Sequence, residues 1–293
     1  MKVCVFCQQD FSSPDWRCPV CGKSPVQLED FYAFAPELAR QNDGFSPEYF
    51  RNLAEIEPGH FWFESRNHTI VWALETYFSE AETFLEIGCG TGFVLSSVSA
   101  ALPHLRASGS EIFVEGLQFA AGRLPGIDLF QMDARSIPFR SEFDAIGAFD
   151  VLEHIEDDRL VLRQMWQAVK PGGGVLITVP QHPFLWSSVD DNAFHKRRYT
   201  RAELAGKLRE ANFEMLHMTS FVTLLLPFML LSRLRFKGRR KESMDHPEFR
   251  IPPVLAEFFA AVSRVEESLI RKGRSLMAGG TLFAIARRPT CSS

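Results

Sequence analysis

The sequence predicts an α/β protein with a Rossmann-like, doubly wound and mainly parallel sheet. Short apolar runs alternate with segments of helical apolar spacing from residue 83 onward, and a glycine-rich turn follows the first run. The 293 residues, 46% apolar and 23% charged, also suffice for one large core with appendages. A ligand is therefore expected at the carboxyl ends of the parallel strands.

The chain divides into three expected parts. Residues 1–27 carry four cysteines, residues 28–82 combine aromatic clusters with helical spacing, and residues 83–293 hold the alternating pattern. A helical insertion is expected inside the third part, over about residues 222–275, before a last strand.

The first part is predicted to be a small zinc-ribbon-like unit. Its cysteines follow the pattern CxxC-x10-CxxC, and the second pair lies in CPVCG, which is typical of a thiolate knuckle. Four thiolates without a histidine suit structural Zn2+, because such a site leaves no open coordination position. A reduced or redox-active thiol cluster is the alternative. The expected metal ligands are Cys4, Cys7, Cys18 and Cys21.

The second part is predicted to hold a helix that follows an aromatic cluster. Helical spacing relates Ile70, Val71, Leu74, Tyr77 and Phe78. The preceding stretch, GHFWFESRN, has three consecutive aromatic residues. It can be interpreted as a staple that packs the helix on the core. It can also be interpreted as a lid over the ligand, which would bring Trp62 and Arg66 to a substrate.

The third part supplies the sheet. Apolar runs predict five strands, near residues 83–87, 106–111, 127–132, 143–149 and 174–179. Helical spacing predicts four helices, near residues 92–101, 113–122, 157–169 and 201–211. The stretch NFEMLHMTSF suggests a sixth strand, and GGTLFAIARR, residues 279–288, a strand that closes the edge of the sheet.

The insertion begins with an apolar run, FVTLLLPFMLL, which is too short to span a bilayer and contains Pro227. The basic stretch RLRFKGRRK follows. The next segment has the pattern of an amphipathic helix with one apolar face. A core helix with a solvated basic end is the simpler interpretation. Peripheral contact of residues 221–241 with an anionic membrane surface is the alternative. That apolar face comprises Val254, Leu255, Phe258, Phe259, Val262, Val265 and Leu269.

The glycine-rich turn lies in TFLEIGCGTGF, where Gly88, Gly90 and Gly92 are spaced GxGxG. A dinucleotide-binding turn would use GxGxxG to approach a pyrophosphate. Glu86 argues against that ligand, because its carboxylate would repel a pyrophosphate and attract an ammonium or sulfonium centre. S-adenosylmethionine carries both cationic centres and no phosphate.

Further acids end the next three predicted strands. Glu111 has the spacing of a carboxylate that accepts both ribose hydroxyls. Asp133 is placed to accept a hydrogen bond from the adenine amino group, with Ala134 offering its N–H. Asp150 ends the fourth strand, and Glu153 and His154 follow on the turn in FDVLEHIEDD.

Taken in order, FLEIGCGTG, GSEIF, MDA, FDVLEHIEDD and KPGGGVLITVP resemble the motifs of class I S-adenosylmethionine-dependent methyltransferases. The chain looks most like the branch with the quinone-biosynthesis O-methyltransferases. The resemblance covers about residues 60–220 and 278–288. It implies a seven-stranded sheet whose last strand is antiparallel, and Glu111 departs from it, since aspartate is commoner there. The implied cofactor-binding residues are Glu86, Gly88, Cys89, Gly90, Gly92, Glu111, Ile112, Asp133, Ala134, Asp150 and Val151.

Methyl transfer needs alignment of the acceptor with the sulfonium and exclusion of water, and a base only if the acceptor must lose a proton. The expected catalytic residues are His154, His195 and Tyr199. The expected substrate-binding residues are Trp62, Arg66, His182, Trp186 and Arg198. The alternatives are structural: His154 could brace its turn, and His195, Arg198 and Tyr199 could pin the loop of residues 180–200 to the sheet.

The predicted function is methyl transfer from S-adenosylmethionine to a small-molecule acceptor, with S-adenosylhomocysteine as product. One alternative is an rRNA or other nucleic-acid methyltransferase that docks through its ribbon, but the net charge of −4 and pI near 6.1 argue against it. A second alternative is a non-catalytic cofactor-binding interaction protein. The N-terminus, MKVCVFC, lacks an apolar export signal, so a cytoplasmic location is expected.

Overall fold

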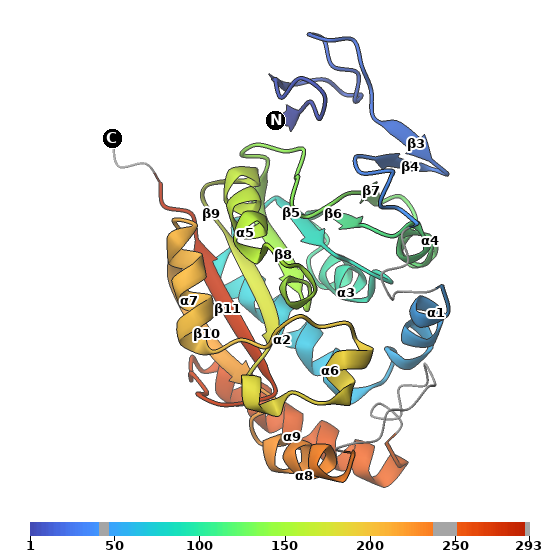
Figure 1. The fold of residues 1–293 in the computed structure, drawn as a ribbon. Helices are drawn as coiled ribbons and strands as arrows, with labels where there is room; N and C mark the ends of the chain where they lie inside the picture. Colours follow the sequence, from blue (N-terminus) through green and yellow to red (C-terminus); the bar gives the residue numbers. More distant parts are fainter. Residues whose placement is uncertain (41–46, 237–250, 291–293) are drawn as a thin grey trace.

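A computed structural model describes residues 1–40, 47–236 and 251–290. The described chain holds a nine-stranded mixed sheet with helices on both faces (Figure 1). The strand order is β10-β11-β9-β8-β5-β6-β7-β4-β3, and β1 and β2 form a separate pair. The expected α/β fold class is therefore confirmed.

Five strands at the centre of the sheet are parallel, and each lies where the sequence predicts one. They are β5 (Thr83–Ile87), β6 (Arg106–Glu111), β7 (Asp128–Gln131), β8 (Phe143–Phe149) and β9 (Val169–Pro180). The chain passes from β5 to β6 on one side and returns to β8 on the other side. In folds of this kind the point of reversal, here at the carboxyl ends of β5 and β8, is where a ligand-binding crevice is expected.

The last strand, β11 (Thr281–Arg287), is antiparallel to both of its neighbours, β9 and β10 (Glu214–Phe221). The expectation that this strand closes the edge of the sheet is wrong, since β11 lies between the other two and β10 forms the edge. Residues 282–286 of β11 are at most 1% exposed. A strand buried on both faces reads as a continuous apolar run, LFAIA, and such a run fits an interior position better than an edge.

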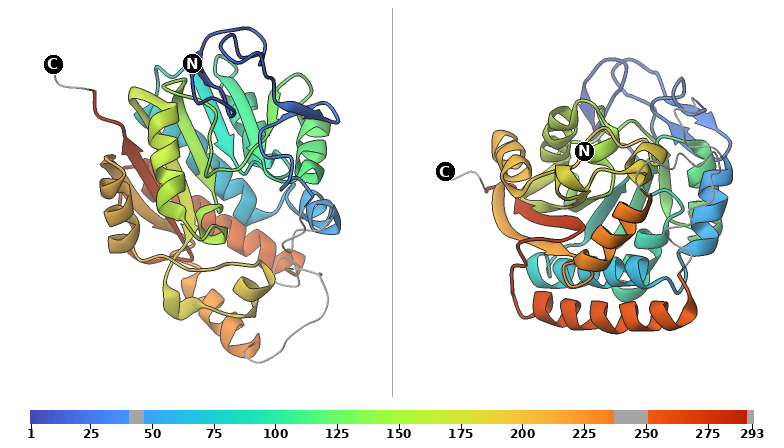
Figure 2. Two further views of the ribbon diagram at one scale, coloured as in Figure 1. Left: turned by 45° about the horizontal axis from the view of Figure 1, so that its top comes forward. Right: turned by 60° about the horizontal axis from the view of Figure 1, so that its bottom comes forward.

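Two hydrophobic cores lie on opposite faces of the sheet (Figures 1 and 2). The first face is covered by α5 (Asp158–Ala168) and α7 (Arg201–Glu210). The other face is covered by α2 (Phe61–Tyr77), α3 (Phe93–Ala101) and α4 (Val114–Arg123). Each helix buries an apolar stripe against the strands, which explains the helical spacing in the sequence.

The N-terminal segment joins the sheet. After β1 (Lys2–Val3) and β2 (Asp10–Phe11), the strands β3 (Val26–Leu28) and β4 (Phe31–Ala33) extend the sheet beyond β7. Strand β4 pairs in parallel with β7, so the edge strand of the seven-stranded core is covered. The sequence did not predict these two short strands.

The N-terminal unit also covers the loop between β7 and β8, which has no helix of its own. The Val3 N–H donates to the Pro138 carbonyl at 2.9 Å. The Trp16 ring meets Phe34, Phe130 and Phe139 at centroid distances of 4.4, 6.0 and 5.4 Å. Edge-on aromatic contacts of this kind stabilise a core beyond simple burial. The cysteine-bearing unit is thus packed into the main core.

The insertion contains two helices, α8 (Leu226–Phe236) and α9 (Pro253–Arg271). Helix α9 lies along the outer side of α2, as Figure 2 shows, and Phe61 contacts Phe259 at a centroid distance of 5.5 Å. Residues 237–241 lie outside the described residues, and they make up most of the basic stretch for which membrane contact is the alternative interpretation. Among the described residues, none of the helices has the length and apolar character needed to cross a bilayer.

Candidate active site

The turn after β5 brings the backbone close to the crevice. Gly88, Gly90 and Gly92 have φ angles of +66°, +52° and +75°, a region that favours glycine. A Cβ atom at Gly88 would lie 2.5 Å from the side chain of Val151, so only glycine fits against the turn that follows β8. Gly92 is the N-cap of α3. The turn therefore presents backbone atoms, not side chains, to a ligand.

Glu86 lies at the bottom of this turn and is 2% exposed. In the part of the chain that the structure describes, its Oε2 atom has no hydrogen-bond partner. Burial raises the pKa of Glu86 well above its usual value, and the nearby charge of Arg66 opposes that shift. A buried acceptor without a partner costs free energy unless a ligand satisfies it. A cationic ligand group fits this position.

Glu111, at the end of β6, ties the glycine turn to the next strand. Its Oε2 accepts the Gly90 N–H at 3.0 Å, and its Oε1 accepts the N–H groups of Ile112 and Phe113 at 2.8 and 3.3 Å. Burial raises the pKa of Glu111, and the three N–H groups oppose that shift. The longer glutamate side chain thus reaches back across the crevice to the turn.

Asp133 and Ala134 follow β7, beside Glu111. The carboxylate of Asp133 is 13% exposed and is paired with Arg135, whose Nη2 lies 2.7 Å away. Ala134 is buried. The structure therefore brings the two residues expected at the adenine end to the same edge of the sheet as the glycine turn.

Asp150 ends β8 in the left-handed region, at φ +57°, which is unusual for a non-glycine residue and is often found at functional sites. Its Oδ2 is 2.8 Å from Nη1 of Arg66. The guanidinium of Arg66 also lies over the rings of Trp62 and Phe63, at 4.8 and 5.4 Å from the centroids. The first turns of α2 thus place Trp62 and Arg66, both expected to bind substrate, beside a residue expected to bind the cofactor.

Sequence reasoning missed a hydrogen-bonded cluster that links the glycine turn to other elements. It consists of Thr91 in the turn, Glu57 and Arg123. The Thr91 hydroxyl lies 2.7 and 2.6 Å from the carboxylate oxygens of Glu57, which is 3% exposed. Arg123, on α4, donates to Glu57 at 2.9 Å and to Thr91 at 3.0 Å. Burial raises the pKa of Glu57, while the Thr91 and Arg123 hydrogen bonds oppose it. Nothing in the local pattern EIEPGHF signals this role, because its partners are distant in sequence.

Cys89, in the middle of the turn, is 5% exposed and its N–H donates to the Ser110 carbonyl at 2.9 Å. A Cβ atom at Gly109 would lie 3.0 Å from its sulfur. Its side chain therefore packs between β5 and β6. Only the backbone of Cys89 is therefore available to contact a ligand.

His154 lies on a single helical turn, η1 (Leu152–His154), that follows Asp150. Burial, and then the charge of His195, lower its pKa to about 3, so the imidazole is neutral at physiological pH. The rings of His154 and His195 are 4.9 Å apart. The structure thus brings together two of the three residues expected to be catalytic.

The loop after β9 is organised around Asp190, which lies on α6 (Ser188–Asn192) and is fully buried. Its carboxylate contacts His195 Nδ1 at 3.0 Å, Arg198 Nε at 2.6 Å and Arg233 Nη1 at 3.0 Å. Arg198 also donates to the Gln181 carbonyl at 2.9 Å. The guanidinium expected to bind an acidic substrate therefore holds the loop.

Tyr199 is fully buried. Its hydroxyl oxygen is 2.6 Å from Asp158 Oδ2 and 3.2 Å from the Leu152 carbonyl. Burial, and then hydrogen bonding to Asp158, raise its pKa. In this position Tyr199 anchors the loop to α5, and a catalytic role would require the hydroxyl to leave both partners.

His182 and Trp186 lie at the start of the same loop, around the short helix η2 (Pro183–Leu185). His182 has φ +64° and its ring contacts Phe184, which is 72% exposed. Trp186 is 40% exposed and its indole N–H donates to Asp191 at 3.0 Å. Trp186 therefore lies at the surface of the loop and is accessible to a ligand, whereas His182 is half-buried.

The four N-terminal cysteines come together as expected for metal ligands. Cys4 Sγ and Cys21 Sγ are 3.6 Å apart, and Cys7 Sγ and Cys18 Sγ are 3.7 Å apart. All four sulfurs lie within 4.8 Å of one another. Tetrahedral zinc with bonds of about 2.3 Å needs sulfur separations of roughly 3.8 Å. The thiolate set fits such an ion.

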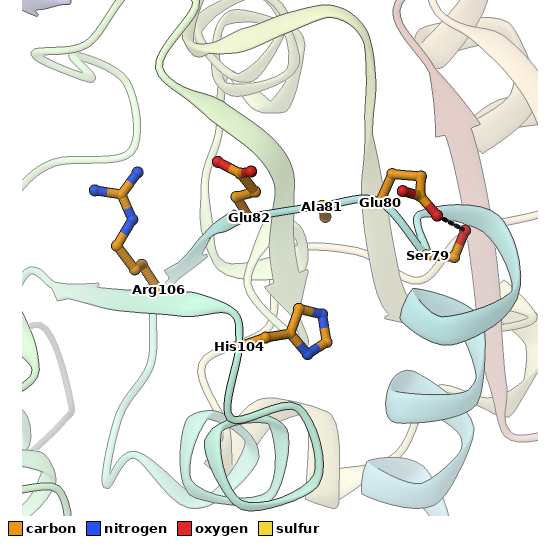
Figure 3. A pocket seen from close by; sticks show the side chains of 6 residues that line it. All are labelled: Ser79, Glu80, Ala81, Glu82, His104 and Arg106. Carbon is orange, nitrogen blue, oxygen red and sulfur yellow. Dashed lines mark hydrogen bonds between the residues drawn. The ribbon is translucent and has the colours of Figure 1, made fainter.

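A hollow of about 380 Å³ lies at the opposite edge of the sheet (Figure 3). Its lining residues precede β5 and β6, so it opens at their amino ends, away from the glycine turn. Ligands of parallel α/β sheets bind at the carboxyl ends. The hollow is therefore not the expected active site. It is lined by Ser79, Glu80, Ala81, Glu82, His104 and Arg106.

This fold and site define the Rossmann-like methyltransferase class. The sequence profile described as a methyltransferase domain matches residues 49–218, and the chain belongs to that family of S-adenosylmethionine-dependent methyltransferases. The "Probable S-adenosylmethionine-dependent methyltransferase Rv3030" of Mycobacterium tuberculosis is 23% identical over 290 residues, which cover 88% of this chain and 99% of that one.

Two further similarities are informative. A ubiquinone biosynthesis O-methyltransferase of Aromatoleum aromaticum is 25% identical over 166 residues, covering 55% of this chain and 64% of that protein. The phosphoethanolamine N-methyltransferase 2 of Haemonchus contortus, solved with S-adenosyl-L-methionine, superposes with a TM-score of 0.58. That match has 16% identity and covers 85% of this chain and 59% of the other, so it shows a shared fold.

Proposed function

We propose that this protein transfers a methyl group from S-adenosylmethionine to a small-molecule acceptor. The observation that carries the proposal is the buried Oε2 of Glu86 at the glycine turn, which has no hydrogen-bond partner among the described residues and therefore favours a cationic ligand group. The similarity to O-methyltransferases supports a small acceptor, and so does the acidic net charge. We further propose that the protein belongs to the branch of quinone-biosynthesis O-methyltransferases.

The cofactor would lie along the carboxyl ends of the strands. Glu86 would bind the amino group of its methionine part, and the backbone of the turn would follow the chain of the cofactor. Glu111 would exchange some of its N–H partners for the ribose hydroxyls, and Asp133 with Ala134 would hold the adenine. Asp150 would lie near the sulfonium, with its charge partly balanced by Arg66 at 2.8 Å.

The enzyme's own contribution to the reaction would be alignment and exclusion of water. The first turns of α2 would cover one side of the acceptor with Trp62. The loop of residues 180–200 would cover the other side, with His182 and Trp186 near its start. His154 and His195 would face the space between them.

We also infer that the four N-terminal cysteines bind one structural Zn2+. The thiolate distances support this, and so does the inclusion of Cys4 and Cys18 in the main core. The ion would complete a unit too small to fold on its own.

A transfer assay tests the proposed function. The protein is incubated with S-adenosylmethionine carrying a labelled methyl group and a panel of phenols, carboxylic acids, amines and quinols. We expect label in at least one acceptor class, together with S-adenosylhomocysteine, and at least tenfold slower transfer by Asp150→Asn. The exposed Asp128→Asn substitution is the matched control, with unchanged transfer. A protein that binds the cofactor yet labels none of these classes would support the non-catalytic alternative.

A further inference from the structure

Three potential metal ligands meet beside the crevice, outside the cysteine cluster. Glu153 and His154 come from the turn after β8, and His195 comes from the loop after β9. One ligand atom from each lies within 4.8 Å of the other two. His195 Nε2 is 4.0 Å from Glu153 Oε1. Residues separated by about forty positions in sequence are thus gathered around one point.

The carboxylate of Glu153 lacks a hydrogen-bond partner among the described residues. The residue is 0% exposed, and within the part of the chain that the structure describes neither side-chain oxygen has a hydrogen-bond partner. The nearby Arg198 is directed to Asp190 and to the Gln181 carbonyl. A carboxylate that is buried without a partner is strongly unfavourable. The position therefore favours a cationic group that the described residues do not supply.

The orientation of His195 points to the kind of group. Its Nδ1 is 3.0 Å from Asp190 Oδ1, and Asp190 is held by Arg198 and Arg233 at 2.6 and 3.0 Å. An ionised Asp190 accepts a hydrogen bond from the Nδ1–H group of His195. The lone pair of the neutral ring then lies on Nε2, the nitrogen on the side of Glu153. A histidine that binds a metal usually donates its other ring N–H to a carboxylate, which orients the ring.

We propose that Glu153, His154 and His195 bind a divalent transition-metal ion, with Zn2+ as the test ion. One carboxylate and two imidazoles form a donor set typical of zinc sites that keep an open coordination position. Zinc bonds of about 2.0–2.2 Å require ligand atoms roughly 3.3–3.6 Å apart, so the three groups would close by about 1 Å on binding. His154 and His195 are partly exposed, which leaves a path for the ion.

This ion would lie close to the methyl acceptor, since Glu153 is three residues from Asp150. The open position would take an acceptor hydroxyl and lower its pKa, so that its proton passes to solvent. The oxygen then bonds to the methyl carbon while the carbon–sulfur bond breaks and its electron pair leaves with sulfur. This second step rests on the proposed methyl transfer, and it favours acceptors with an ionisable hydroxyl group.

Zinc stoichiometry tests the site without any turnover. The full chain is saturated with Zn2+, dialysed and analysed for metal, and we expect about two zinc ions per chain, one of them on the cysteines. Glu153→Gln and His195→Asn should each retain about one. Glu156→Gln is the matched control, because this glutamate lies three positions further on and its side chain is 82% exposed. It should retain about two.

A wild-type protein that keeps about one zinc ion, or a second ion that persists in both variants, would overturn the site. Circular dichroism and thermal unfolding show that the variants are folded, and Glu153→Gln keeps the shape of the side chain if His195→Asn does not fold. Binding of S-adenosylhomocysteine by calorimetry is measured on the same samples. A wild-type chain that does not bind the cofactor would reject the proposed methyl transfer, whereas a wild-type chain that binds the cofactor but keeps only one zinc ion would reject only this inference.

Discussion

At the scale of single residues, Glu86 and Glu111 show what sequence chemistry can predict. A carboxylate before a glycine turn indicated a cationic ligand, and the structure places Glu86 there with an unpartnered oxygen. The spacing to Glu111 also placed it at the crevice. Sequence could not show that Glu111 bonds three backbone N–H groups, or that Glu57 supports Thr91. Such partners depend on tertiary packing and not on local pattern.

Substitution of Glu111 gives a graded prediction. Glu111→Gln should weaken binding of S-adenosylhomocysteine by about 1–3 kcal/mol, because a charge-assisted hydrogen bond becomes a neutral one. Glu111→Ala should weaken it at least as much, since the Gly90 N–H also loses its acceptor. Isothermal titration calorimetry measures both. Glu115→Gln on the following helix is the control, and equal affinity of Glu111→Gln and wild type would remove the ribose role.

The anchoring of Tyr199 has a measurable pH dependence through Asp158. Burial would raise the pKa of Asp158, but the hydrogen bonds from Lys207 and Tyr199 outweigh it and hold the pKa below its usual value. The folded pKa is lower than the unfolded one, so the ionised form stabilises the fold above about pH 4 and this stabilisation is lost as pH falls further.

We therefore expect Asp158→Asn to lower the free energy of unfolding at pH 7 by about 1–3 kcal/mol. The difference from wild type should shrink when pH falls below about 4. Urea unfolding at pH 7, 5 and 3.5 measures it. Asp128→Asn, at an exposed position, should match wild type throughout. A deficit of constant size at all three pH values would mean that the charge of Asp158 is not what stabilises the loop.

At the scale of elements, long periodic segments were predictable and short ones were not. Strands β5 to β9 lie where the sequence pattern predicted them, and most residues of β5, β8 and β9 are buried. Strands β3 and β4 are three residues each and depend on pairing with β7. Gln131 completes that pairing: its side chain bonds both backbone groups of Ala35, at 3.1 and 2.8 Å, and the Ile112 carbonyl at 2.9 Å.

Removal of the proposed N-terminal zinc ion should therefore affect the whole domain. Cys18 is 1% exposed and belongs to the same core as β5 and β8, so Cys18→Ser or chelation should lower the melting temperature by several degrees in one transition. Differential scanning calorimetry measures it, with the exposed Gln9→Ala as control. Two separate transitions, with the upper one unchanged, would show that the N-terminal unit folds independently of the sheet.

At the scale of the whole molecule, the strand order of the sheet brings together acidic residues that are distant in sequence. The reversal at β5 brings the carboxyl ends of β5, β6, β7 and β8 to one edge of the sheet, so Glu86, Glu111, Asp133 and Asp150 lie along that edge. Motif order in the sequence was sufficient to predict this arrangement. The apolar run LFAIA of β11 fits an interior strand, but the antiparallel insertion of this strand between β9 and β10 is a property of topology that the run does not specify.

The central claim is that the crevice binds S-adenosylmethionine, and calorimetry with its product tests it most directly. The wild-type chain is titrated with S-adenosylhomocysteine and, separately, with NADH. We expect saturable binding of about one S-adenosylhomocysteine per chain, in the micromolar range, and no binding of NADH. Saturable binding of NADH, with none of S-adenosylhomocysteine, would contradict the account.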